Sequence, residues 1–244
     1  MTLTGACPGT VFSQVGTGIP SSIPVLIGTG IGGIIYSFLK PRIAASPDIV
    51  QKEKGTPSFT KPTLADRAGF SNLTALALYE VFLVGMVTGV VHFFPRNNPS
   101  LVDPVLGGAL IGVSQLTSLL LTSSTLGTST AFEQVGDLFW WLLSPSKPRP
   151  SIRGTAFATG ALAGAYLLTL VAAVPMPDEN IPIGTARAVG GGAILILGSR
   201  IAGGCTSGHG ISGMSMLSVA SILTVGGMFA GGMGSAALFR TIGW

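Results

Sequence analysis

The chain has 244 residues, of which 47% are hydrophobic, 9% are charged and 7% are aromatic, with a net charge of +4. Soluble domains carry roughly 25% charged residues, so this composition and the mean hydropathy of +0.64 favour a membrane protein. The aromatic content is too low for a surface that stacks nucleic-acid bases, so we expect no nucleic-acid partner. Two widely separated cysteines exclude a disulfide framework, and the start "MTLTGACPGT" lacks the basic and apolar regions of a signal peptide.

Six segments have the length and apolar character of membrane-spanning helices, which need about 20 residues to cross a core of about 30 Å. They are 21–39, 72–94, 104–122, 154–174, 185–203 and 219–239, and the first is short for a span and interrupted by glycine. Pairs of glycines four residues apart either favour close helix packing or arise by chance in a glycine-rich chain. These pairs are Gly28/Gly32, Gly85/Gly89, Gly108/Gly112, Gly160/Gly164 and Gly227/Gly231.

Three further stretches, 8–18, 126–143 and 206–218, are too short or too polar to cross a membrane alone. Each has Gly, Pro, Ser or Thr within its first two positions, which are typical of helix starts, so we interpret them as half-helices or re-entrant segments. Irregular backbone at membrane depth is tolerated only where it is buried in protein or lines a cavity, so a pathway is expected there. The sequence therefore predicts an all-α, polytopic membrane bundle with pseudo-repeats and broken or re-entrant half-helices. We expect a single transport domain over 1–244, with halves of about 1–143 and 154–244.

The predicted loops differ in charge. The loop 40–71 contains six Lys or Arg residues and 144–153 contains three, whereas 175–184 carries Asp178 and Glu179 and 95–103 has only Arg96. The positive-inside rule places 40–71 and 144–153 in the cytoplasm and the other two outside. This topology requires 126–143 to dip into the membrane and return to the side it left. The long loop 40–71 is expected to be an exposed, poorly ordered connector.

Two short motifs surround the cysteines: "GACPGT" (5–10) and "GGCTSG" (203–208). Both place a thiol after two small residues, as expected for two copies of one local device in a repeat-built transporter. Glycines let a substrate approach the backbone, a helix start presents free N–H groups, and a neutral thiol is a soft, weak donor. The combination suits a small sulfur oxyanion.

The stretches "SRIAGGCTSGHGISGMSMLS" (199–218) and "LTGACPGTVFSQVGTG" (3–18) resemble the two signature motifs of the YeeE/YedE-like sulfur-transport family, the thiosulfate transporters. "LGTSTAF" (126–132) is similar to a further element of that family. The resemblance implies an hourglass-shaped helical bundle with a pseudo-symmetric interior. It also implies thiosulfate uptake, in which the ion passes between cysteines through S–H···S and S–H···O hydrogen bonds, with Cys7 and Cys205 as the pathway thiols.

The motifs and the resemblance together define the expected site. Its substrate-pathway residues are Cys7, Cys205, Gly5, Gly9, Thr10, Gly204, Thr206, Ser207, Gly208, His209 and Arg200. We expect no catalytic residue, cofactor or metal ion. The expected partners are thiosulfate or a similar sulfur oxyanion, the lipid bilayer of the plasma membrane, and either a soluble sulfur-carrier protein or a second membrane subunit.

The chain departs from the family in two ways. Some members carry a third pathway cysteine, whereas this chain has two. A full helix is predicted before Cys205, but only six residues precede Cys7. We therefore expect a fragment, a mis-assigned start, or one half of a system that another subunit completes.

Ionisable residues inside predicted membrane segments are functional candidates. Arg200 either attracts an anion to the mouth of the pathway or extends to the interface. Glu80 either pairs with a neighbour or carries a coupling proton. Glu133 and Asp137 are expected to cap a helix or pair with loop cations, away from the anion. His209 is interpreted as polar lining or as a group that hydrogen-bonds to the backbone, in preference to a proton relay.

Two other functions stay open beside an importer. Cys205 and His209 lie four residues apart and would suit a membrane-embedded, thiol-dependent sulfur-transfer enzyme, although the sequence offers no soluble domain to present the thiol. The same pair is too small a set for a zinc site, because zinc binds three or four protein ligands. A non-transporting partner subunit is the third reading. We favour a transporter that is not an enzyme.

Overall fold

The computed structural model describes residues 2–43, 63–65, 69–93, 104–122, 127–144, 149–171 and 183–241. Within these residues the chain is all-α, as predicted, with one isolated bridge between Thr63 and Ser218. The helices are α1 (Thr10–Gly16), α2 (Ser22–Ile43), α5 (Asn72–Phe93), α6 (Pro104–Thr122), α7 (Ser129–Leu143), α8 (Arg153–Val171), α9 (Thr185–Ile201), the π-helix η2 (Gly208–Gly213) and α10 (Val219–Thr241). A helix is found at each of the six predicted spans and at each of the three predicted half-helices.

Four helices in the described part are long and apolar enough to cross a membrane: Ser22–Ile43, Leu73–Phe93, Arg153–Val171 and Val219–Thr241. The apolar helix Val105–Leu121 is shorter. The chain is therefore an integral membrane protein. Helix α9 has 17 residues and two arginines, and it ends just before the broken segment that carries Cys205.

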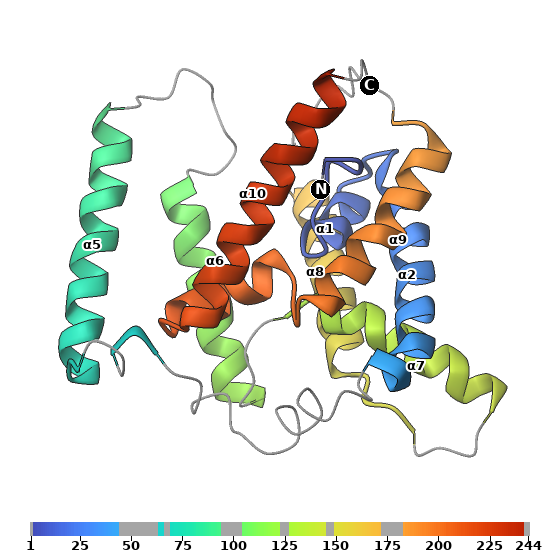
Figure 1. The fold of residues 1–244 in the computed structure, drawn as a ribbon, viewed down its shortest axis with the longest axis horizontal. Coiled ribbons are helices and arrows are strands. Elements are labelled where there is room, and N and C mark those ends of the chain that lie inside the picture. The colour runs from blue at the N-terminus through green and yellow to red at the C-terminus, as the bar shows by residue number, and fades with distance from the viewer. Residues whose placement is uncertain are drawn as a thin grey trace.

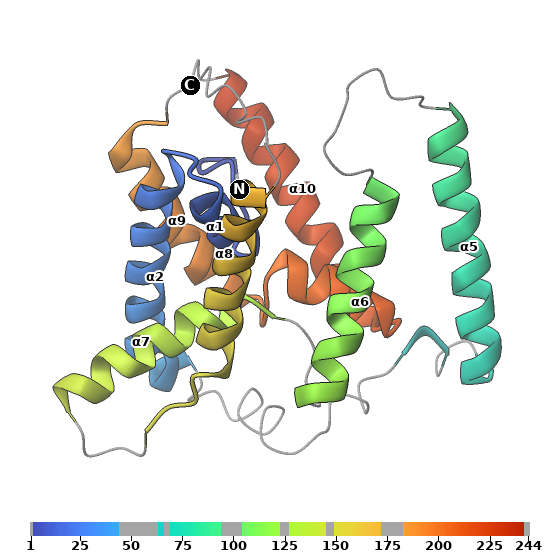
Figure 2. The same cartoon turned by 180° about the vertical axis from the view of Figure 1, so that it is seen from behind.

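The helices alternate in direction between the two ends of the molecule (Figures 1 and 2). Helices α2 and α7 end, and α5 and α8 begin, at one end, whereas α5 ends and α6 and α9 begin at the opposite end. Helix α6 finishes on the same side of the molecule on which α8 starts. Helix α7, which lies between them in the sequence, therefore does not pass from one side of the molecule to the other, as the re-entrant prediction required. The helices that border the basic ranges 40–71 and 144–153 have these ends on one side, and the helices that border 95–103 and 175–184 have theirs on the opposite side. This agrees with the grouping of the ranges by charge.

Helix α2 packs against α9 and α7, and glycines make both contacts possible. A Cβ on Gly28 would clash with the backbone of Val189, and one on Gly32 would lie 2.7 Å from the Ala193 carbonyl oxygen. Because glycine lacks a Cβ, the two helix backbones approach closely at this pair, which is the close-packing alternative of the two that the spacing left open. The expectation that glycine interrupts the first span is wrong: α2 is continuous over 22 residues, since its glycines are packing positions.

The other predicted glycine pairs have no such role in the described part. At Gly85/Gly89, Gly108/Gly112, Gly160/Gly164 and Gly227/Gly231, an added Cβ would meet no described atom within 4 Å. Helix α5 exposes most of its apolar side chains, including Leu73 and Phe93. These surfaces are available to lipid.

The predicted loop 40–71 differs from expectation at both described ends. Helix α2 continues to Ile43 and so includes Lys40 and Arg42. The segment 63–65 is packed: the Leu64 amide donates to the Leu217 carbonyl oxygen at 3.0 Å, and Ala65 is 4% exposed. The connector is therefore helical to Ile43 and packed at Ala65, whereas Leu64 and Phe70 are exposed, as expected. Positions 44–62 and 66–68 lie outside the described residues.

Candidate functional site

The two cysteine motifs share a backbone conformation as well as a sequence pattern. Gly5 and Gly203, each two residues before a cysteine, have φ values of +61° and +78°, which favour glycine. A helical turn then follows each cysteine: the Cys7 carbonyl oxygen accepts the Thr10 amide at 3.0 Å, and that of Cys205 accepts the His209 amide at 2.9 Å. The predicted duplication thus extends to local geometry.

Cys205 is the buried centre of the site. Its side chain is 1% exposed, and its Sγ lies 2.9 Å from Ser207 Oγ and 3.7 Å from Thr128 Oγ1. The two hydroxyl groups are themselves 3.2 Å apart. Ser207 precedes η2 but makes no side-chain capping hydrogen bond, so its hydroxyl faces the sulfur and not the helix start. The thiol is therefore surrounded by two groups that both donate and accept hydrogen bonds.

Gly9 brings the first motif against the second. A Cβ at position 9 would lie 3.0 Å from Ser207 Oγ and 3.4 Å from Thr128 Oγ1. Three segments that are distant in sequence, each marked by the family resemblance, therefore meet at one point. Thr128 is absent from the predicted site residues, although the motif "LGTSTAF" contains it.

Cys7 has a different environment from Cys205. It is half-buried, and its Sγ accepts a hydrogen bond from Thr10 Oγ1 at 3.4 Å. The Cys7 amide also donates to Thr10 Oγ1 at 2.9 Å. Among the described residues no hydrogen bond joins the two cysteines. The structure thus brings Gly9, Ser207 and Cys205 together and leaves Cys7 paired with Thr10.

Two cavities meet at the second motif. The first, the His209 cavity, has a volume of about 620 Å³, and its lining includes Arg200, Gly204, Gly208, His209, Ser129 and Ser212. The second, the Cys205 cavity, has a volume of about 330 Å³ and is lined in part by Cys205, Thr206, Pro8, Met228 and Gly231. Gly204 and Gly208 face one cavity while Cys205 and Thr206 face the other. The segment 204–208 therefore forms part of the wall between them.

His209 and its neighbours form the polar lining of the first cavity. The His209 Nδ1 lies 3.1 Å from Ser221 Oγ, which anchors the ring to α10. Gln115 of α6 donates to Ser212 Oγ at 3.0 Å and so links that helix to η2. His209 thus lines the cavity and contacts a side-chain hydroxyl of α10, and its role in the pathway stays a prediction.

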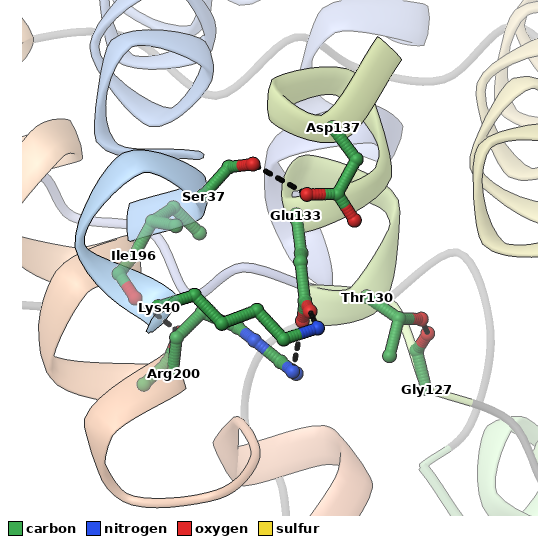
Figure 3. Close-up of polar contacts among 9 residues, drawn as sticks. Ser37, Lys40, Gly127, Thr130, Glu133, Asp137, Ile196 and Arg200 are labelled. Carbon is green, nitrogen blue, oxygen red and sulfur yellow. Dashed lines mark hydrogen bonds and ion pairs between the residues drawn. The ribbon is translucent and has the colours of Figure 1, made fainter. Parts of the chain in front are cut away.

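Arg200 turns inward and takes part in an ion-pair cluster (Figure 3). Its guanidinium pairs with the Glu133 carboxylate, and Lys40 Nζ lies 2.6 Å from the same carboxylate. The Arg200 side chain is 10% exposed and stacks 5.4 Å from the centre of the Tyr36 ring. The guanidinium is therefore held within the protein by Glu133 and Tyr36. Glu133 pairs with a cation of the predicted loop, as expected, although Lys40 proves to be helical.

The other two acidic candidates lie apart from the thiol. Asp137 accepts a hydrogen bond from Ser37 Oγ of α2. Glu80 is exposed on α5, and no described residue pairs with it, so the expectation of structural pairing is not met in this part of the chain. Neither residue lines the His209 cavity or the Cys205 cavity.

The fold and the site define a class: an all-helical membrane protein in which broken helices carry a buried thiol between two cavities. Residues 1–234 match the sulphur transport family, so the chain belongs to that family. A protein of Xylella fastidiosa strain Temecula1 described as a probable transporter is 31% identical over 133 residues, which are 54% of this chain and 90% of that protein. A probable transporter of strain 9a5c is 29% identical over the same length and the same shares. The family resemblance of the motifs is confirmed, and the chain is a sulfur-related membrane transporter.

Proposed function

We propose that the chain imports thiosulfate, or a closely related small sulfur anion, across the plasma membrane along a route that includes Cys7 and Cys205. The observation that carries this proposal is the position of Cys205. Its thiol is buried beside two hydroxyl groups in the segment that separates two cavities. An ion that passes from one cavity to the other would meet this thiol.

The chemistry around Cys205 favours weak and reversible binding. Ser207 and Thr128 offer neutral O–H donors for the oxygens of the anion, and the thiol is a soft, polarisable partner for its outer sulfur. Neutral donors hold an anion less strongly than charged ones. Conduction requires sites that release their ion, so this arrangement suits passage better than storage. Cys7, with Thr10 beside it, repeats the thiol–hydroxyl pair at a second station.

The proposed orientation follows from charge. Helix α2 ends and α8 begins at the same end of the molecule, and in the sequence these helix ends fall within the basic ranges 40–71 and 144–153. The positive-inside rule favours the cytoplasm for this end. On this orientation the His209 cavity, which contacts the start of α5 through Ala75 and Leu76, faces the cytoplasmic side.

Uptake of ³⁵S-labelled thiosulfate into liposomes that contain the purified chain tests the proposal. We expect uptake by the unmodified chain, a loss in Cys205→Ala, and largely retained uptake in His209→Ala, whose ring is anchored to Ser221. Equal uptake by Cys205→Ala and the unmodified chain would contradict the route.

Two further outcomes identify the other readings. A persulfide on Cys205 without accumulation of label inside the liposomes would indicate a sulfur-transfer enzyme. Uptake that begins only after a second membrane subunit or a sulfur-carrier protein is added would indicate one component of a larger system.

A further inference from the structure

The wall of the His209 cavity contains a buried positive charge that the thiol chemistry does not use. Arg200 lines this cavity from the last turn of α9, and its side chain is 10% exposed. A buried charge is costly unless it is paired, and here Glu133 supplies the pairing. Lys40 binds the same carboxylate at 2.6 Å. The side chains of Lys40, Glu133 and Arg200 together carry a net charge of +1.

The hydrogen-bonding capacity of Arg200 is also only partly used. A guanidinium has five N–H donors in a planar fork. The Nη2 atom of Arg200 pairs with Glu133, whereas its Nε is buried and has no hydrogen-bond partner among the described residues. The Tyr36 ring, 5.4 Å from the guanidinium carbon, restricts the orientation of the plane. A fixed guanidinium with an unused buried donor is suited to bind a further acceptor.

The surroundings of Arg200 favour an anionic acceptor. Among the described residues that line the His209 cavity, none is Asp or Glu, and Arg200 is the one Lys or Arg. The lining also includes the hydroxyl groups of Ser129, Ser212 and Ser218, all of them buried. Arginine binds oxyanions through two parallel N–H···O bonds, which match the spacing of two oxygens on one central atom.

We infer that Arg200 forms an oxyanion-binding site in the His209 cavity, where it binds the oxygens of a small sulfur oxyanion beside the wall that carries Cys205. Glu133 is a positioning residue that holds the guanidinium in place (Figure 3). Gly204 and Gly208, which flank Cys205, line the same cavity, so an ion at Arg200 lies in the chamber that leads to the thiol segment. The inference rests on the proposed function for its transport role, but binding itself is separately measurable.

The site is expected to recognise oxygens and to be indifferent to the soft sulfur. Sulfate and thiosulfate share three oxygens and a double negative charge, so both are probes. Isothermal titration calorimetry of the purified full chain in lipid nanodiscs, with sodium sulfate and with sodium thiosulfate, measures the two dissociation constants. Binding of both salts by the unmodified chain is the expected result. Binding of neither would overturn the inference.

Three variants test the assignment to Arg200. Arg200→Gln removes a charge-assisted hydrogen bond and is expected to raise both dissociation constants by about tenfold to a hundredfold. Arg200→Lys keeps the charge without the planar fork, so its dissociation constants are expected to lie between those of the unmodified chain and those of Arg200→Gln. The matched control Arg240→Gln removes an exposed arginine near the end of α10 and is expected to bind like the unmodified chain. Unchanged binding by Arg200→Gln would overturn the inference.

A second variant tests whether weaker sulfate binding by Arg200→Gln arises from misfolding. Arg200→Gln leaves Glu133 with Lys40 alone, so the double variant Glu133→Gln/Arg200→Gln removes the buried carboxylate together with the guanidinium. If this folded double variant binds sulfate like the unmodified chain, the assignment is wrong. If its binding is as weak as that of Arg200→Gln, the assignment is supported.

The uptake experiment separates this inference from the proposed function. Cys205→Ala is expected to lose uptake and to keep sulfate binding, because Arg200 is intact. Sulfate binding that depends on Arg200 in a chain without uptake would support the site and refute the proposed function. Uptake that depends on Cys205, with sulfate binding unaffected by Arg200→Gln, would refute the site alone.

Discussion

Gly9 of the first cysteine motif lies directly against Ser207 of the second: a Cβ at position 9 would be 3.0 Å from Ser207 Oγ and 3.3 Å from Ser207 Cβ. The carbon–carbon distance of 3.3 Å is shorter than an ordinary van der Waals contact between carbon atoms, about 3.5 to 4.0 Å. The contact therefore couples the two motifs mechanically, because any side chain at position 9 must displace the hydroxyl that lies 2.9 Å from the Cys205 sulfur.

The first prediction follows from that contact. Gly9→Ala is expected to move Ser207 away from Cys205 and so to weaken one hydrogen bond of the site. The loss of about 1 kcal/mol corresponds to roughly a fivefold slower thiosulfate uptake in liposomes. Gly190→Ala is the matched control, since no described atom lies within 4 Å of its added Cβ. Equal rates in the two variants would show that the contact does not matter for transport.

The second prediction concerns the Ser207 hydroxyl itself. Ser207→Ala removes a donor at 2.9 Å from Cys205 Sγ and is expected to slow uptake by a similar factor, about fivefold. Thr88→Ala removes a hydroxyl that donates to the Val84 carbonyl oxygen within α5, away from both cavities, and it should leave uptake nearly unchanged. Because Gly9→Ala acts through Ser207, the double variant should be less impaired than the product of the single effects. Strict additivity would argue against the coupling.

The third prediction distinguishes the two thiols by reactivity. Cys7 is half-buried and Cys205 is 1% exposed, so a negatively charged, water-soluble thiol reagent is expected to modify Cys7 at least about tenfold faster. The measurement uses the single-cysteine variants Cys7→Ala and Cys205→Ala and follows adduct formation by mass spectrometry. Faster labelling of Cys205 would mean that its cavity admits the reagent and that its burial does not limit access.

The sequence predicted the elements of this fold well because its signals are local. Long apolar runs define the spans, and glycines next to cysteines define the breaks in the chain. The positive φ of Gly203, two residues before Cys205, is a conformation that favours glycine, so the residue type agrees with the observed geometry, although this angle was not predicted from the sequence. The family motifs also identified the segments that meet at the thiol.

The contacts between elements were not predictable in the same way. Nothing in the sequence around Thr128 states that its hydroxyl faces a sulfur 77 residues away in the chain. The run of basic residues that Lys40 begins predicts a loop, yet α2 continues through Lys40, and the partner that it meets, Glu133, is on α7. Such pairings depend on tertiary packing, which local sequence patterns do not encode.

The fourth prediction concerns the ion-pair cluster. Glu133→Ala leaves Lys40 and Arg200 without their shared carboxylate, and breaking a buried pair in this way is strongly destabilising. We expect a loss of about 3 kcal/mol in the free energy of unfolding, near the low end for such changes, because the Lys40 side chain is 37% exposed. Denaturant titration in detergent micelles measures it. Asp137→Asn, which keeps an oxygen for Ser37, is the matched control and should cost less than about 1.5 kcal/mol. Comparable losses in both variants would contradict a special role for Glu133.

The fifth prediction concerns the crossing of α2 and α7, which positions Glu133 and the segment of Thr128. Gly33 lies against the Phe132 carbonyl group, and Gly136 lies against the carbonyl group of Gly33, so an added methyl group at either position forces the backbones apart. Gly33→Ala and Gly136→Ala are each expected to lower the free energy of unfolding by about 1 to 3 kcal/mol, as overpacking does. Gly30→Ala on the same helix meets no described atom within 4 Å, and its higher helix propensity should leave the protein equally or more stable. If thermal unfolding in detergent ranks Gly30→Ala as the least stable of the three, α2 does not pack on α7 in this register. The ion-pair geometry at Arg200 would then have to be rebuilt as well.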